Sequence, residues 1–296
     1  MNSQVAVGIK DTTKKRSQIK FIWHRFKKNK LAMIGLFMLI VLTILSISAP
    51  LLRDYDKDVI SQDVKIRFQS PNREHILGTD QYGRDIFARI IYGGRISLSM
   101  GFAVVAIAML FGSIIGASAG YYGGKIDNIL MRIMDVFLAI PQILMAMAIV
   151  AALGTDIKNL LMAMTIANIP KFARIVRSAI LQIRNQEFIE AARACGTSDA
   201  RIILKHIIPN AIGPIIVQAT LNIAQTIIGI AGLSFIGLGI QPPKPEWGTM
   251  LAEAKSQMRN YPYLVIVPGL SIMMAVLAFN LIGDGLRDAL DPKLKN

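Results

Sequence analysis

Residues 31–52, LAMIGLFMLIVLTILSISAPLL, contain no charged side chain. An apolar helix of about 20 residues is long enough to cross the hydrocarbon core of a membrane. The segment before it, residues 1–30, is basic, with nine Lys and Arg against one Asp. Because no small-residue cleavage site ends the apolar run, we expect a retained first transmembrane helix rather than a cleaved signal peptide.

The composition of the whole chain agrees with a membrane protein. Of 296 residues, 53% are hydrophobic and 18% are charged, whereas soluble domains have about 25% charged residues. This composition excludes a disordered chain, a collagen-like repeat and a coiled coil. The single cysteine, Cys195, excludes an intramolecular disulfide and a cysteine cluster for zinc or iron–sulfur. The three histidines, His24, His75 and His206, lie far apart, so we expect no metal site.

Five further apolar segments follow, so we expect an all-α polytopic bundle of six transmembrane helices. The remaining predicted spans are 96–122, 129–153, 160–180, 207–238 and 263–282. Pro141 is expected to kink the third span. The fourth can cross only if Lys171, Arg174 and Arg177 reach toward one interface.

Small residues recur along the second span. Gly112, Gly116 and Gly120 are four residues apart, which places them on one helix face. Glycines on one face allow two helices to approach closely within a membrane. We therefore expect a tight helix contact along this face.

The distribution of Lys and Arg predicts the orientation. One set of segments holds 21 basic and nine acidic residues, and the other holds 12 and 10. The first set comprises 1–30, 123–135, 171–206 and 284–296, and the second comprises 53–95, 154–158 and 239–262. Because cytoplasmic loops carry the excess of Lys and Arg, we expect both termini in the cytoplasm. The net charge of +14 is then a topology signal, and we expect no nucleic-acid partner.

This topology divides the chain into five parts. They are a basic cytoplasmic segment (1–30), the first span (31–52), an extracytoplasmic loop (53–95), a five-helix core (96–283) and a cytoplasmic tail (284–296). The core contains a polar segment, 186–209, between its third and fourth helices.

Residues 186–209, QEFIEAARACGTSDARIILKHIIP, carry the most specific signal. They predict two short helices joined at Gly196 and Thr197, because glycine can adopt the positive φ that ends a helix. Thr197 or Ser198 can cap the second helix. A helix–turn–helix of this kind can dock in a groove of a soluble partner. The plainer interpretation is an ordinary amphipathic loop on the cytoplasmic side.

The same segment resembles a known motif. Glu190, Ala191 and Ala192, followed by Gly196 and then by Pro209, resemble the EAA motif of ABC importer permeases. In that family the segment is the coupling helix, which fits the nucleotide-binding subunit. The resemblance therefore implies a type I ABC importer permease fold and an ATPase-coupling role for these five residues.

Other parts of the chain point to one branch of that family. His206 and Ile208 depart from the broad family pattern, which often has Ile and Leu there. Residues 75–89 and 234–248 resemble the C-type permease subunit of the dipeptide/oligopeptide (peptide/nickel) branch. Three separated motifs thus agree in order and spacing. Di- or oligopeptides are the expected substrates, and nickel chelates, glutathione or oligosaccharides stay open.

The resemblance also implies partners and a location. The partners are a homologous second permease, two ATP-binding subunits, an extracytoplasmic substrate-binding protein and membrane lipid. The location is a bacterial or archaeal cell membrane. Residues 119–126, the nearest approach to a phosphate-binding loop, lack its first glycine and its hydroxyl residue. We therefore expect no catalytic residue and no cofactor on this chain, with ATP and Mg bound by the partner subunits.

Polar residues within the spans are candidates for a transport path. Gln218, Asn222 and Gln225 share one face of the fifth span. They are expected either to bond to another helix or to line a peptide path. No span carries the chain of Asp, Glu and His typical of proton relays. A secondary transporter or channel without an ATPase, or a non-transport scaffold, remains the alternative function.

The charged residues ahead of the second span are interpreted as structural. Asp80 and Arg84 have the spacing of an ordinary surface helix pair, and Asp85 is adjacent. Thr79 or Asp80 is expected to cap this helix. Trp247, in the proline-rich loop 239–262, is expected to anchor the chain at the membrane interface or to contact a binding protein.

Overall fold

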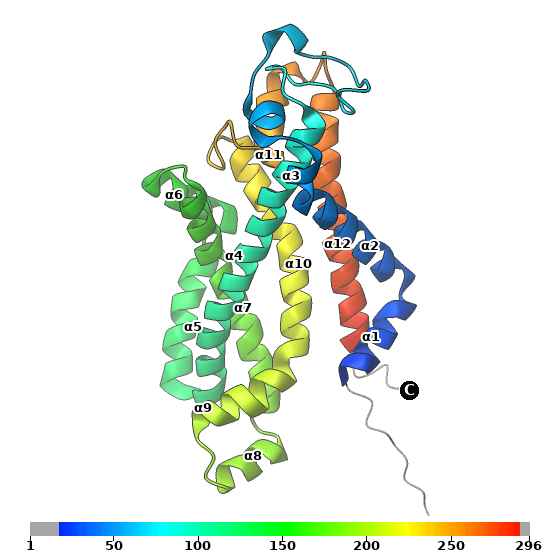
Figure 1. The fold of residues 1–296 in the computed structure, drawn as a ribbon. Coiled ribbons are helices and arrows are strands. Elements are labelled where there is room, and N and C mark those ends of the chain that lie inside the picture. Colours follow the sequence, from blue (N-terminus) through cyan, green and yellow to red (C-terminus); the bar gives the residue numbers. More distant parts are fainter. Residues whose placement is uncertain (1–17, 291–296) are drawn as a thin grey trace, which may run out of the picture.

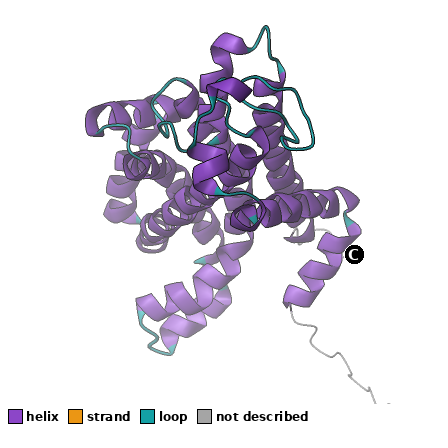
Figure 2. Ribbon diagram, turned by 45° about the horizontal axis from the view of Figure 1, so that its top comes forward, coloured by secondary structure: helices purple, strands orange, loops and turns teal. Residues whose placement is uncertain are grey.

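The computed structural model describes residues 18–290, which form a bundle of helices (Figure 1). Within these residues there is no strand beyond one isolated bridge between Thr79 and Asp85. Figure 2 shows the helices throughout and the longer loops gathered at one end of the bundle. The predicted all-α class is confirmed. The outer parts of the predicted terminal segments, residues 1–17 and 291–296, lie outside the described residues.

Six lengths of helix build the bundle. They are α2 (Lys30–Ile47), α4 (Ile86–Tyr122), the pair α5 (Gly124–Leu138) and α6 (Gln142–Leu153), α7 (Ile157–Ile183), α10 (Ile208–Phe235) and α12 (Tyr263–Leu290). Four helices are long and apolar enough to cross a membrane, namely α2, α4, α12 and the continuous stretch that contains α10. The bent pair α5–α6 brings this number to five among the described residues. Helix α7 is not among them because of its charged side chains, but it packs inside the bundle against α4, α6 and α10. The structure is thus compatible with the six predicted spans.

The third predicted span is broken rather than continuous. Helices α5 and α6 meet at an angle of 82°, and Pro141 is the residue before α6. The proline lacks a backbone N–H and its ring obstructs a continuing helix. The predicted kink at Pro141 is confirmed, and its size turns α6 away from the direction of α5.

Shorter elements lie at the two ends of the bundle (Figure 1). One end carries α3 (Ala49–Leu52), η1 (Tyr55–Ile60), η2 (Val64–Ile66), α11 (Trp247–Ala254) and η4 (Lys255–Gln257). The other end carries α1 (Gln18–Lys28), α8 (Glu187–Ala194), α9 (Asp199–Ile202) and η3 (Ile203–Ile207). The start of α1 and the end of α12 both lie toward the α8–α9 end (Figure 1). Two termini at the same end agree with an even number of membrane crossings by the chain.

The glycine face of α4 lies against α7, as the sequence predicts. A Cβ atom placed on Gly112 would lie 2.5 Å from the Cβ of Phe172, and one on Gly120 would lie 3.1 Å from the carbonyl oxygen of Arg177. At Gly116 the same atom would lie 2.9 Å from the Cβ of Val176. Side chains larger than hydrogen would therefore push the two helices apart.

Helix α4 starts at Ile86, ahead of the span predicted from residue 96 but later than a helix capped at Thr79 or Asp80. Asp85 caps it, because its carboxylate accepts a hydrogen bond of 2.7 Å from the N–H of Ala88. The prediction that Thr79 or Asp80 is the cap is wrong. The Thr79 hydroxyl instead accepts from the N–H of Gln69 at 2.8 Å, and Asp80 accepts from the N–H of Tyr82 at 2.8 Å. Both side chains are used within the loop before the helix begins.

Candidate functional site

The segment 186–209 projects from one end of the bundle (Figure 1). Helix α8 ends at Ala194 with Cys195 as its C-cap, and Gly196 has a φ of +73°, which confirms the predicted helix stop. Ser198 occupies the cap position of α9, but its side chain makes no capping hydrogen bond. Beyond α9 the chain winds through η3 directly into α10.

One side of this segment is attached to the bundle. Ile189 and Ile202 are fully buried in a cluster with Val176 and Ile180 of α7. The hydroxyl of Tyr121, at the end of α4, donates to the Asp199 carboxylate at 2.7 Å. These contacts fix α8 and α9 to the ends of α4 and α7.

The other side of the segment is open. Glu190, Ala191, Gly196 and Pro209 are exposed, and Ala192 is partly buried against the Ile189 cluster. The ring of Phe188 is also exposed. Four of the five predicted coupling residues therefore stand on the accessible side of a segment that joins α7 to α10.

The three predicted path residues do not form one network. Asn222 is buried, accepts a hydrogen bond of 2.7 Å from the Lys171 ammonium and donates one of 3.0 Å to Asn168. Gln218 is partly buried and Gln225 is exposed. These residues were expected either to bond to another helix or to line a peptide path, and Asn222 makes the expected bonds to another helix. The prediction that Lys171 reaches an interface is wrong, because its ammonium points to α10.

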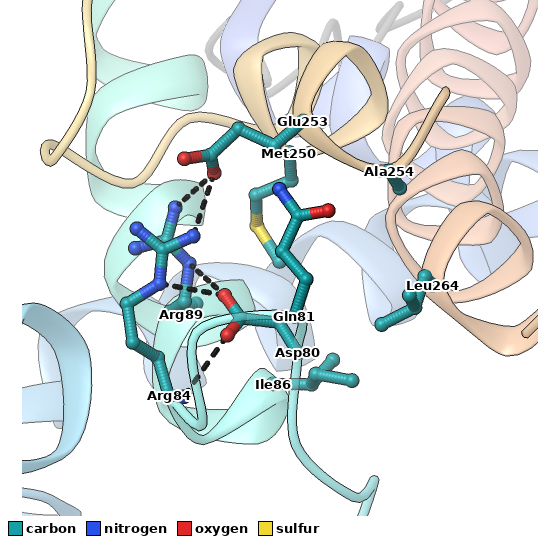
Figure 3. A pocket seen from close by; sticks show the side chains of 9 residues that line it. All are labelled: Asp80, Gln81, Arg84, Ile86, Arg89, Met250, Glu253, Ala254 and Leu264. Carbon is teal, nitrogen blue, oxygen red and sulfur yellow. Dashed lines mark hydrogen bonds and ion pairs between the residues drawn. The ribbon is translucent and has the colours of Figure 1, made fainter. Parts of the chain in front are cut away.

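A buried charge cluster joins the start of α4 to α11 (Figure 3), which lies at the opposite end of the bundle (Figure 1). Arg84 bonds to Asp80 at 2.6 Å and to Glu253 of α11 at 3.0 Å. Arg89 bonds to Glu253 at 2.8 Å and donates to the carbonyl oxygen of Val59 at 3.1 Å. The cavity among these residues is about 20 Å³, too small for a substrate. The cluster therefore joins segments of the chain to one another.

The interpretation of Asp80 and Arg84 as a surface helix pair is wrong. They do pair, but both are buried and lie in the loop before α4. The missing information was Glu253, which lies far along the chain and supplies the second carboxylate for both arginines. The feature of the sequence that could have indicated this cluster is a pair of arginines, Arg84 and Arg89, on either side of the start of a helix.

Trp247 is not at an interface, so this prediction is also wrong. The side chain is 1% exposed, and its indole N–H donates to the carbonyl oxygen of Ile90 at 3.0 Å. Gly93 and Gly94 of α4 leave the space that the indole fills, since a Cβ there would lie 3.2 and 3.1 Å from it. Glu246 beside it caps α11 and accepts from the Ser97 hydroxyl at 3.1 Å. The tryptophan thus fixes α11 on α4.

Two family models match the sequence. One describes the inner membrane component of binding-protein-dependent transport systems and matches residues 108–296. The chain belongs to this family. The other describes the N-terminal transmembrane domain of oligopeptide transport permease C and matches residues 17–71. The protein is therefore a multi-pass membrane permease, as the EAA-like motif predicted.

Curated relatives cover nearly the whole permease. It is 50% identical to the dipeptide transport system permease protein DppC of Alkalihalophilus pseudofirmus, over 93% of this chain and 90% of that protein. It is 40% identical to DppC of Haemophilus influenzae, over 95% of this chain and 96% of the relative. It is also 45% identical to the glutathione transport system permease protein GsiD of Escherichia coli, over 95% and 94% of the two chains.

Solved structures agree on the fold. The permease resembles a chain of the MetNI methionine ABC transporter in an inward facing conformation, with a TM-score of 0.57 at 20% identity. The match covers 69% of this chain and 97% of the other. An amino acid ABC transporter gives a TM-score of 0.52, covering 67% and 92%. At such identity the likeness shows the shared fold of ABC transporter permeases.

Proposed function

We propose that this permease carries di- or oligopeptides into the cell as one half of an ATP-driven, binding-protein-dependent importer. The support for the substrate class is the identity of 50% and 40% to permeases named for dipeptide transport. Relatives named for glutathione transport are 45% identical. Because glutathione is itself a small peptide, it is the second candidate substrate.

The observation that carries the coupling proposal is the continuity of segment 186–209 with two spans. Helix α7 leads into α8, and α9 leads through η3 into α10. A soluble subunit that pushes on the open side of α8, at Glu190 and Ala191, would therefore move α7 and α10 together. Rotation of packed helices about such a contact is a common way to switch between two states.

The partners follow from this arrangement. A homologous second permease would complete the bundle, and two ATP-binding subunits would hold ATP and Mg and contact segment 186–209. The excess of Lys and Arg supports a cytoplasmic location for this end and for both termini. The end with α11 and the buried charge cluster would then face the binding protein outside the cell.

Replacement of Gly196 with valine tests the coupling role. At a φ of +73° a β-branched residue is strongly disfavoured, so Gly196→Val should distort the turn between α8 and α9. We expect ATP-dependent uptake of dialanine by the reconstituted complex to fall about tenfold or more, which corresponds to a loss of only about 1.4 kcal/mol of coupling energy. Uptake and ATP hydrolysis are measured together in liposomes.

A matched control is Gly237→Val. Gly237 has a φ of +86° and, like Gly196, has no atom within 4 Å of an added Cβ, but it lies near the other end of the bundle. This variant is expected to keep most of the uptake. A second variant, Glu190→Trp, leaves the backbone unstrained and blocks only the open side of α8. If both Gly196→Val and Glu190→Trp took up dialanine at the wild-type rate, segment 186–209 would not be the coupling element.

A further inference from the structure

Lys171 lies near the middle of α7. At 1.5 Å per residue it is about 21 Å from the start of α7 and about 18 Å from its end. The hydrocarbon core of a membrane is about 30 Å thick. With α7 centred on such a core, Lys171 would lie near the midplane, where the phosphate groups of lipids do not reach.

Two other cations on α7 have carboxylate partners. Arg174 bonds to Asp135 of α5 at 2.7 Å, and Arg177 bonds to Asp127 at 2.5 Å. Lys171, three residues from Arg174 and farthest from the α8 end, instead donates to the side-chain oxygen of Asn222 at 2.7 Å. None of the ion pairs found among residues 18–290 includes Lys171.

The partners of Lys171 are neutral and held in place. The amide nitrogen of Asn222 donates to Asn168 at 3.0 Å, and the amide nitrogen of Asn168 donates to the carbonyl oxygen of Met164 at 2.7 Å. This series of hydrogen bonds aims the oxygen of Asn222 at the ammonium but brings no negative charge. An ammonium has three N–H donors, and one is used here.

A cation at the midplane without a carboxylate is costly, and residues of this kind mark substrate pathways. We propose that Lys171 binds the C-terminal carboxylate of the peptide in transit and that Asn222 positions its ammonium. This inference rests on the proposed transport of peptides. Peptides of any sequence share this carboxylate, so one fixed cation suits a path that tolerates varied side chains. The site lies between α7 and α10, the two helices that segment 186–209 joins, so motion of that segment reaches it.

The test uses the complete complex in liposomes, with dialanine and dialanine amide as substrates. Dialanine amide lacks the carboxylate that Lys171 is proposed to bind. The affinity of the binding protein for each substrate is measured separately, and both are supplied at saturating concentration. The variants are K171Q, K171R and N222D. The control K158Q makes the same change of charge at an exposed position near the start of α7.

We expect K171Q to reduce dialanine uptake about tenfold to a hundredfold, the value of one hydrogen bond to a charged group. Uptake of dialanine amide should stay at its wild-type level, so that the preference for the free carboxylate disappears. K171R keeps a cation and should retain a large part of dialanine uptake. K158Q should transport both substrates like the wild type.

The variant N222D separates substrate binding from a structural role. An aspartate at this position would form an ion pair with Lys171. The ammonium would then not be available to the carboxylate of a peptide. If the contact only braces α7 against α10, N222D should transport dialanine as well as the wild type. The proposal expects N222D to lose uptake to the same degree as K171Q while the complex still assembles.

Three outcomes would decide against the inference. The inference is overturned if K171Q transports dialanine normally or if K171Q loses uptake of both substrates equally. It is also overturned if N222D shows normal uptake of dialanine. A wild-type complex that moves neither dipeptide but does move another ligand of its binding protein would instead overturn the proposed substrate class. The two failures are therefore distinguishable.

Discussion

Replacement of Arg89 with methionine is expected to destabilise the permease by about 3–5 kcal/mol, because removal of one member of a buried ion pair leaves its partner charged and uncompensated. Arg89 is 1% exposed and bonds to Glu253, to the carbonyl oxygen of Val59 and to that of Pro243. One side chain thus holds three separate segments on α4. Methionine fills similar space but offers no donor.

The measurement is thermal unfolding of the purified permease in detergent. Arg259→Met is the matched control, since Arg259 lies on the same end of the bundle but is exposed. Exposed substitutions usually change stability by less than about 0.5 kcal/mol. An Arg89→Met protein that unfolds at the same temperature as the control would show that the charge cluster does not hold this end together.

Replacement of Gly116 with alanine is expected to cost about 3 kcal/mol, the upper end of the usual penalty for overpacking. The added Cβ would lie 2.9 Å from the Cβ of Val176, 3.0 Å from the backbone nitrogen of Arg177 and against the carbonyl oxygen of Ala173. Two of these atoms belong to the backbone of α7, which cannot move without displacing the whole helix. The expected result is a lower unfolding temperature and a lower yield of folded protein.

Gly269→Ala provides the control for this change. Gly269 is also inside a helix, α12, but an added Cβ meets no atom within 4 Å. Alanine has a higher helix propensity than glycine by about 1 kcal/mol, so this variant should be as stable as the wild type or slightly more stable. Equal stability of the two alanine variants would contradict the close contact between α4 and α7.

Local sequence patterns predicted the helices and the turn of the coupling segment. The apolar run at 31–52, the glycine spacing on α4 and the positive φ at Gly196 depend on residues close together in the chain. Periodicity and turn chemistry read such features directly. For the same reason Pro141 indicated a break between α5 and α6.

The charge cluster and the place of Trp247 were missed because they depend on distant residues. The spacing of Asp80 and Arg84 is that of a surface pair. Glu253, which is distant in the sequence, lies beside Arg84 and Arg89 and makes them part of a buried cluster. A tryptophan in a proline-rich loop is typical of an interface anchor. The indole of Trp247 is instead buried, because Gly93 and Gly94 leave room for it on α4. No local pattern pairs such residues, since the bundle brings them together only when it folds.

The two ends of the permease differ in a way that suits transport. The end with α11 is fixed by buried ion pairs and by the buried Trp247. The end with α8 is fixed on one side only, and its other side is open. A force applied at α8 would therefore reach α10, whose opposite end packs against α11.

The central claim is tested most directly by uptake of labelled dialanine into liposomes that contain the complete complex. The account predicts uptake that requires both ATP and the binding protein and that stops when a non-hydrolysable ATP analogue replaces ATP. Uptake that continues without ATP would contradict it and would indicate a secondary transporter or channel. A complex that moves no ligand of its binding protein would contradict it as well and would indicate a scaffold.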